Sequence, residues 1–123
     1  MALTPLTALS PLDGRYHDKV AALRAHFSEL GFMRLRVLVE IEWLKALARE
    51  PAIAEVPPFS SETNKPLDPL AADFFETDSA HVKAIEAKTN HDVKAIEYFL
   101  RERFAGEAEL GKATEFLHFA CTS

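Results

Sequence analysis

The longest helical pattern in the sequence is FMRLRVLVEIEWLKALAR, which runs from Phe32 to Arg49. Apolar residues recur in it at the three- and four-residue spacing of one helix face, in the row Leu35, Leu38, Ile41, Leu44 and Ala48. Val37, Val39 and Trp43 widen this row into a belt, which indicates a helix that packs on more than one neighbour. Pro51 cannot continue a helix, so the pattern predicts an end near Arg49.

The segment before this helix contains a second, shorter pattern. Up to Tyr16 the chain holds Pro5, Pro11 and Gly14, which predict an extended arm with turns. From about Asp18 the spacing of apolar residues predicts a short helix. We expect Gly31 to interrupt that helix before the long one begins.

Several short elements are predicted after the long helix. Five prolines between positions 51 and 69 predict a surface loop. Helices are then predicted over residues 70–75, over 79 to about 89, from 90 to just before Gly106, and over 114–119. No alternation typical of strands persists, so we expect one all-α domain over residues 1–123, with short helices around one longer helix.

Composition narrows the functional classes. The chain has 123 residues, 48% of them hydrophobic and 27% charged, which is typical of a globular protein. Its formal charge is −5 and its 14 basic residues are interleaved with acidic ones, so we expect neither nucleic acid nor an anionic membrane as partner. The single cysteine, Cys121, excludes an internal disulfide, and no apolar run is long enough to span a bilayer, so we expect a cytoplasmic protein.

The triplet Asn90-His91-Asp92 lies where one predicted helix ends and the next begins. Unpaired N–H groups and partial positive charge at a helix start favour an anion such as phosphate. Asn90 or Asp92 can cap the helix, while His91 can donate to an anion or carry a proton. Alternatively, Asn90 and Asp92 are only caps and His91 is a surface residue.

Two further candidate segments lie near the ends of the chain. Arg15 and Tyr16 offer a guanidinium and a phenol for phosphate, carboxylate or ring contacts, or else form an ordinary surface salt bridge and a packing aromatic. Thr122 and Ser123 offer hydroxyls for an anion, or are simply polar. The remaining histidines lack the spacing of a metal site, so we expect His118 to pack, Cys121 to be buried, and no metal to bind.

Three segments taken together resemble the adenylosuccinate lyases, a family of the fumarase/aspartase superfamily. They are SPLDGRY at 10–16, KTNHDVKAIEYFL at 88–100 and EFLHFACTS at 115–123, which occur in the family's order and span the whole chain. The resemblance implies the N-terminal helical domain of such an enzyme, ahead of a central bundle that forms a homotetramer and a third domain.

The resemblance also implies a reaction and a site. The family removes fumarate from adenylosuccinate to leave AMP, and from the succinylcarboxamide ribotide of purine biosynthesis, without metal or organic cofactor. By position, Arg15 and Tyr16 would hold the nucleotide, Asn90, His91 and Asp92 the substrate, and Thr122 and Ser123 the succinyl portion. His91 would also assist catalysis. Lys94 has no functional counterpart that we can assign.

The family's main acid, a histidine, and its base, a serine on a mobile loop, have no counterpart in residues 1–123. We therefore expect the 123-residue chain alone to show no measurable lyase activity. The measurement is loss of adenylosuccinate absorbance with purified chain, and robust turnover would contradict the expectation. The alternative function is a non-catalytic helical binding or interaction module.

Overall fold

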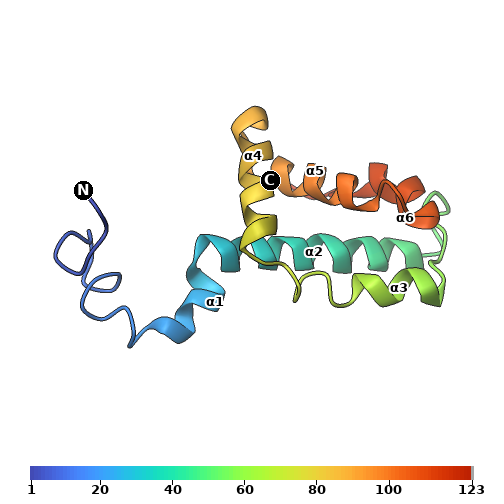
Figure 1. The fold of residues 1–123 in the computed structure, drawn as a ribbon. Helices are drawn as coiled ribbons and strands as arrows, with labels where there is room; N and C mark the ends of the chain where they lie inside the picture. Colours follow the sequence, from blue (N-terminus) through green and yellow to red (C-terminus); the bar gives the residue numbers. More distant parts are fainter. Residues whose placement is uncertain (123) are drawn as a thin grey trace. The chain divides into compact units, whose positions relative to one another are not determined.

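The structure is a computed structural model that describes residues 1–122, and these residues form two units, Met1–Phe32 and Met33 onward. Every regular element in the described residues is helical (Figure 1). In order they are the 3-10 helix η1 (Ala21–Leu23), α1 (Arg24–Phe27), α2 (Glu29–Arg49), α3 (Ser61–Leu67), α4 (Glu76–Thr89), α5 (Asp92–Phe104), α6 (Ala108–Ala113) and the 3-10 helix η2 (Thr114–Phe116). The predicted all-α class, with short helices around one longer helix, is confirmed.

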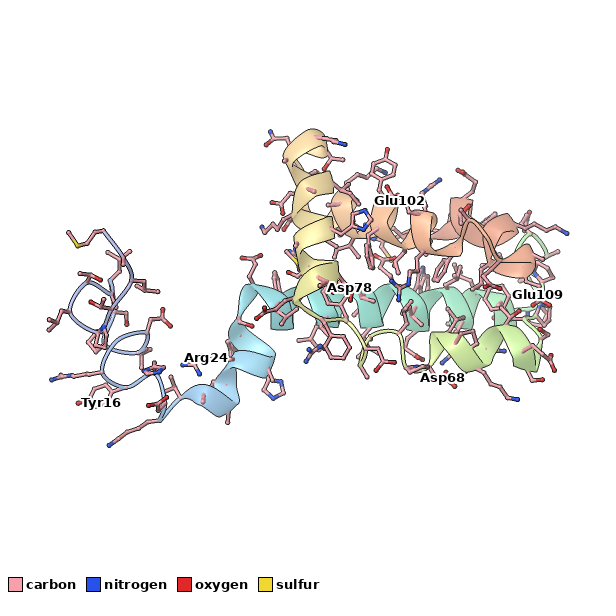
Figure 2. All side chains as sticks on the ribbon, viewed as in Figure 1. Tyr16, Arg24, Asp68, Asp78, Glu102 and Glu109 are labelled. Atoms are coloured by element: carbon pink, nitrogen blue, oxygen red, sulfur yellow. The ribbon has the colours of Figure 1, made fainter. Side chains whose placement is uncertain are left out.

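The first unit begins with consecutive turns rather than a helix, as the prolines predicted. The amide of Tyr16 donates to the carbonyl of Pro11 at 3.0 Å, and the amide of Val20 donates to the carbonyl of Tyr16 at 3.2 Å. Tyr16, labelled in Figure 2, lies on this arm and is exposed. The helix expected from Asp18 begins only at Ala21, and as a 3-10 helix before α1.

The break before the long helix falls at Ser28, and Gly31 lies inside α2. Ser28 has extended backbone (ψ 163°) and its Oγ accepts a bond from the amide of Gly31 at 3.0 Å. A serine at this position therefore caps the new helix. The predicted interruption at Gly31 was wrong, because this glycine serves close packing: a Cβ there would lie 2.5 Å from the carbonyl oxygen of Ala25.

The second unit is organised around α2. Its buried face consists of Met33, Val37, Ile41, Leu44, Leu47 and Ala48, together with one acidic residue, Glu40. Leu35 and Leu38, which the sequence placed on the inward row, are exposed. The inward face is therefore centred on Val37 and Ile41, about one residue from the predicted register. The end of α2 at Arg49 is as predicted.

The proline-rich stretch after α2 contains a helix, α3, where the prolines predicted a loop. Ser60 caps the start of α3, because its side chain accepts a bond from the amide of Thr63 at 3.2 Å. Leu67, the last residue of α3, is buried. Pro66 removes only one amide near the end of this short helix. Lys45 of α2 binds Asp68 at 2.7 Å, which fixes the end of α3 to α2. The helix predicted over residues 70–75 is absent: residues 70–73 form turns, and 74–75 belong to no regular element.

The helices α4 and α5 form a hairpin joined at residues 90–91. The carboxylate of Asp78 accepts a bond from the amide of Phe75 at 2.9 Å, so α4 begins three residues before the predicted Ser79. Ion pairs link the two helices, Arg103 to Asp78 at 3.4 Å and His81 to Glu102 at 2.9 Å; Asp78 and Glu102 are labelled in Figure 2. The predicted ends of both helices, near Thr89 and before Gly106, are confirmed.

The last helical turns differ most from expectation. The predicted helix over 114–119 is present only as η2, and α6 precedes it. The carboxylate of Glu109 in α6 accepts a bond from the amide of Ser60 at 2.8 Å, which joins α6 to the start of α3. This bond lowers the pKa of Glu109. None of the helices between residues 1 and 122 combines the length and the apolar character that a bilayer crossing needs.

Candidate functional site

The turn between α4 and α5 gives the triplet Asn90-His91-Asp92 its geometry. Asn90 ends α4 in the left-handed conformation (φ 52°), and its amide donates to the carbonyl of Glu86 at 2.7 Å. We expected Asn90 or Asp92 to cap α5, but the cap is His91: its Nδ1 accepts a bond from the amide of Lys94 at 3.2 Å. In a neutral ring this bond assigns the proton to Nε2. The triplet is exposed at the start of a 13-residue helix.

Asp92 is held on α2. Its Oδ2 lies 2.7 Å from the guanidinium of Arg36, and its Oδ1 accepts a bond from the amide of Val93 at 2.8 Å. The bond from Val93, and then the one from Arg36, lower the pKa of Asp92 from its ordinary value of 3.8. Asp92 therefore remains a carboxylate in mild acid and fixes the start of α5 to α2.

Replacing Asp92 by Asn should make stability less sensitive to acid. A carboxyl whose pKa is lower in the folded than in the unfolded chain adds stability above pH 3.8, and this stability is lost as the pH falls through the folded value. The free energy of unfolding of wild type should therefore exceed that of Asp92→Asn by its full amount at pH 6, and the difference should vanish well below pH 3.8. Because the side chain is 49% exposed, the advantage should stay under about 1 kcal/mol. Urea unfolding at several pH values measures it, and an advantage that grows with acid would contradict the linkage.

The segment after η2 is held by the same helix. Nδ1 of His118 lies 2.5 Å from Oε1 of Glu40, and the indole N–H of Trp43 donates to the carbonyl of Phe119 at 2.7 Å. His118 is mostly buried, as expected, and has a left-handed backbone (φ 61°). Thr122 is exposed at the end of this segment. Ser123, the other hydroxyl predicted to bind substrate, lies outside the described residues.

Cys121 is exposed, which contradicts the prediction of a buried side chain. The residue lies beyond Leu117, the last buried apolar residue of the described chain, so its thiol is not enclosed by the core. Partial burial, and then the negative charge of Glu40, raise the pKa of Cys121. The thiol is therefore less reactive than its exposure alone suggests.

Three residues on one face of α2 thus anchor both candidate segments. Arg36 holds Asp92, Glu40 holds His118, and Trp43 holds the carbonyl of Phe119. Because residues three and four apart lie on one helix face, these contacts form a continuous row. We call Arg36, Glu40 and Trp43 the anchor row. The apolar pattern alone does not predict the anchor row, although a carboxylate inside the apolar run VLVEI is a usable signal for it.

The third predicted segment, Arg15-Tyr16, belongs to the first unit. The guanidinium of Arg15 lies 4.8 Å from the centre of the Tyr16 ring, and Lys19 lies 5.9 Å from it. Two cations thus gather at one exposed aromatic ring, a combination suited to an anion or a nucleobase. The structure brings 90–92 and 118–122 to one helix, and the joining of Arg15 and Tyr16 to them stays a prediction.

Among residues 1–122, no three histidine, cysteine, aspartate or glutamate side chains lie close enough together to hold a metal ion.

The sequence of this chain matches a known protein family. A family described as "Lyase" matches residues 14–123, which is most of the chain. The chain belongs to the lyase family. Its helical structure is therefore that of the fumarase/aspartase superfamily, as the sequence segments implied.

Several curated relatives are similar to this lyase-family chain. Proteins named adenylosuccinate lyase from Haemophilus influenzae, Vibrio cholerae and Escherichia coli are 60%, 56% and 55% identical to it over 123 residues. Each match covers all of this chain and 27% of the relative. The resemblance is confirmed over the whole chain, which spans about a quarter of the length of these relatives.

Proposed function

We propose that this chain is the N-terminal helical domain of an adenylosuccinate lyase and contributes the substrate-holding part of its site. In this proposal Arg15, Tyr16, Asn90, His91, Asp92, Thr122 and Ser123 bind substrate, and His91 also assists catalysis. The observation that supports it most is the anchoring of Asp92 and His118 on one face of α2, which brings two of the three segments to one helix.

The chemistry of the substrate agrees with these residues. Adenylosuccinate carries a phosphate and two carboxylates, and a chain of net charge −5 must meet it with local donors. The start of α5, the Nε2 proton of His91 and the guanidinium of Arg15 supply such donors. The Thr122 hydroxyl adds a neutral donor for a carboxylate.

The proposed reaction is the β-elimination of fumarate, which leaves AMP. It needs a base to remove a proton beside a carboxylate, donors that hold the enolate-like charge, and an acid for the departing nitrogen. This chain would supply donors of the second kind, and His91 would hold the substrate while the proton transfers are made by residues outside 1–123. No metal or organic cofactor is part of the proposal.

The same proposal covers assembly and location. The complete protein would be a homotetramer in the cytoplasm, with purine nucleotides and fumarate as its small-molecule partners. Light scattering on the complete protein measures the mass, and a stable monomer at micromolar concentration would contradict the tetramer.

Titration with AMP should perturb His91 in the 123-residue chain. The ring lies at the start of α5, so a bound phosphate would change the chemical shift of its Cε1 proton. Two-dimensional NMR of the histidine rings measures this change. His81, exposed on α4 and paired with Glu102, is a matched internal control that should not respond.

Two outcomes would contradict the binding proposal. Equal shifts at His81 and His91 would indicate non-specific contact, and no shift at millimolar AMP would show that this chain does not hold the nucleotide by itself. Adenosine without phosphate should perturb His91 less than AMP, because the proposed attraction is to the anion.

A further inference from the structure

The pair of Glu40 and His118 is a largely buried polar contact between distant parts of the described chain. The two residues are 78 positions apart, and only 5% of Glu40 is exposed. Oε1 of Glu40 and Nδ1 of His118 lie 2.5 Å apart, within hydrogen-bond distance. The pair joins the middle of α2 to the segment that ends in Thr122.

This pair is poorly arranged to serve stability alone. Oε2 of Glu40 and Nε2 of His118 are both buried and have no hydrogen-bond partner in residues 1–122. A buried polar pair with unmet bonds often stabilises a fold no better than apolar residues of the same volume. Such a pair instead fixes the relative position of the two segments that carry it, because its directional hydrogen bond forms in only one arrangement of them.

The backbone of the segment also needs to be held. His118 and Ala120 both have left-handed backbone, with φ of 61° and 60°, and neither is glycine. Such conformations are unfavourable for residues with a Cβ and persist when surrounding contacts enforce them. Here those contacts are the bond between Glu40 and His118 and the bond that Trp43 donates to the carbonyl of Phe119.

The place of the pair on α2 relates it to the start of α5. Arg36, which holds Asp92, precedes Glu40 by four residues, so the two anchors lie about 6 Å apart along one face of the helix. A shift of His118 from Glu40 would therefore move the Thr122 segment relative to the His91-Asp92 turn.

We propose that Glu40 and His118 are positioning residues: their buried pair fixes the segment 118–122 on α2 and so sets the distance between the Thr122 hydroxyl and the substrate-binding turn at 90–92. This inference rests on the proposed function, because the segments it positions are those assigned to the substrate. Neither residue touches the substrate in this proposal.

Trp43 makes the proposal measurable in the chain as it stands. It is the only tryptophan, and its indole N–H binds the carbonyl of Phe119, next to His118. The indole proton signal in NMR and the emission maximum of Trp43 therefore report whether the segment is seated on α2. Thermal unfolding, measured by circular dichroism, reports the stability of the fold separately.

The decisive variant is Glu40→Leu, with Glu102→Leu as its matched control in the exposed pair with His81. Glu40→Leu should shift the indole signal of Trp43, move its emission to longer wavelength and weaken adenylosuccinate binding about tenfold, a change of about 1.4 kcal/mol. It should also lower the unfolding midpoint, because it leaves the buried His118 without its partner, so binding is measured at temperatures where the variant is folded. Glu102→Leu should change none of these. Glu40→Gln, which keeps an acceptor oxygen for His118, should give intermediate values.

Three results would overturn the inference. They are a folded Glu40→Leu chain with unchanged Trp43 signals and adenylosuccinate affinity, equal effects from Glu102→Leu, or a Glu40→Gln chain that loses stability but keeps its affinity. If Glu40→Leu does not fold, Glu40→Gln carries the same comparison.

The failure of the proposed function would look different. If the wild-type chain does not bind adenylosuccinate, the substrate assignment fails, yet the Trp43 signals of the variants still show whether Glu40 holds the segment on α2. If the wild-type chain binds adenylosuccinate, and variants that release the segment keep full affinity, only the positioning role fails.

Discussion

Replacing Phe99 by Ala should lower the free energy of unfolding by about 3–5 kcal/mol, the usual cost of truncating a buried phenylalanine. Phe99 is 3% exposed, and its ring meets those of Phe74 and His81 edge to face, with centres 5.6 Å away in each case. The side chain thus joins α5 to α4 and to the turn before α4. Its loss would leave a cavity in the hairpin that presents Asn90, His91 and Asp92.

Urea unfolding followed by circular dichroism measures this effect, and Tyr98→Ala is the matched control. Tyr98 is the neighbouring aromatic residue on the same helix but is 41% exposed, so its truncation should cost under about 1 kcal/mol. If the two variants lost similar stability, the hairpin core would not be where the structure places it. Weaker AMP binding by Phe99→Ala at temperatures where it is still folded would connect the hairpin to the site.

Much of the fold could be predicted because its determinants are local. The apolar spacing and Pro51 predicted the end of α2 at Arg49, and Asn90 marked the break between α4 and α5. Asn90 occupies the left-handed conformation there, which asparagine tolerates better than most residues. A capping serine outweighed composition at α3, where five prolines suggested a loop.

The candidate site was predictable in part only. The position of 90–92 at a helix start followed from sequence, and the resemblance assigned 15–16 and 122–123. The contacts that hold these segments did not follow, because Glu40 and His118 are 78 positions apart and no periodicity connects them. The predicted inward face of α2 is rotated by about one residue from the observed one for the same reason. The residues that cover Val37, and leave Leu38 uncovered, are distant in sequence.

Replacing Gly31 by Ala should disrupt the bend between α1 and α2, although alanine favours helices by up to about 1 kcal/mol over glycine. A Cβ at Gly31 would lie 2.5 Å from the carbonyl oxygen of Ala25 and 2.8 Å from its carbon, which are backbone atoms that cannot rotate away. Relief of this overlap requires α1 to move, at a typical cost of about 1–3 kcal/mol for overpacking. The clash therefore outweighs the helix propensity.

Hydrogen exchange measures this local effect better than global unfolding. Protection should fall at the amides of Ser28 and Phe32, which donate to the carbonyls of Arg24 and Ser28 across the bend. Gly111→Ala is the matched control, because a Cβ there would meet the carbonyl oxygen of Phe104 at an ordinary 3.5 Å. That variant should gain about 0.5–1 kcal/mol from helix propensity. Equal gains in both variants would show that Gly31 packs loosely and that the bend at Ser28 does not depend on the missing side chain.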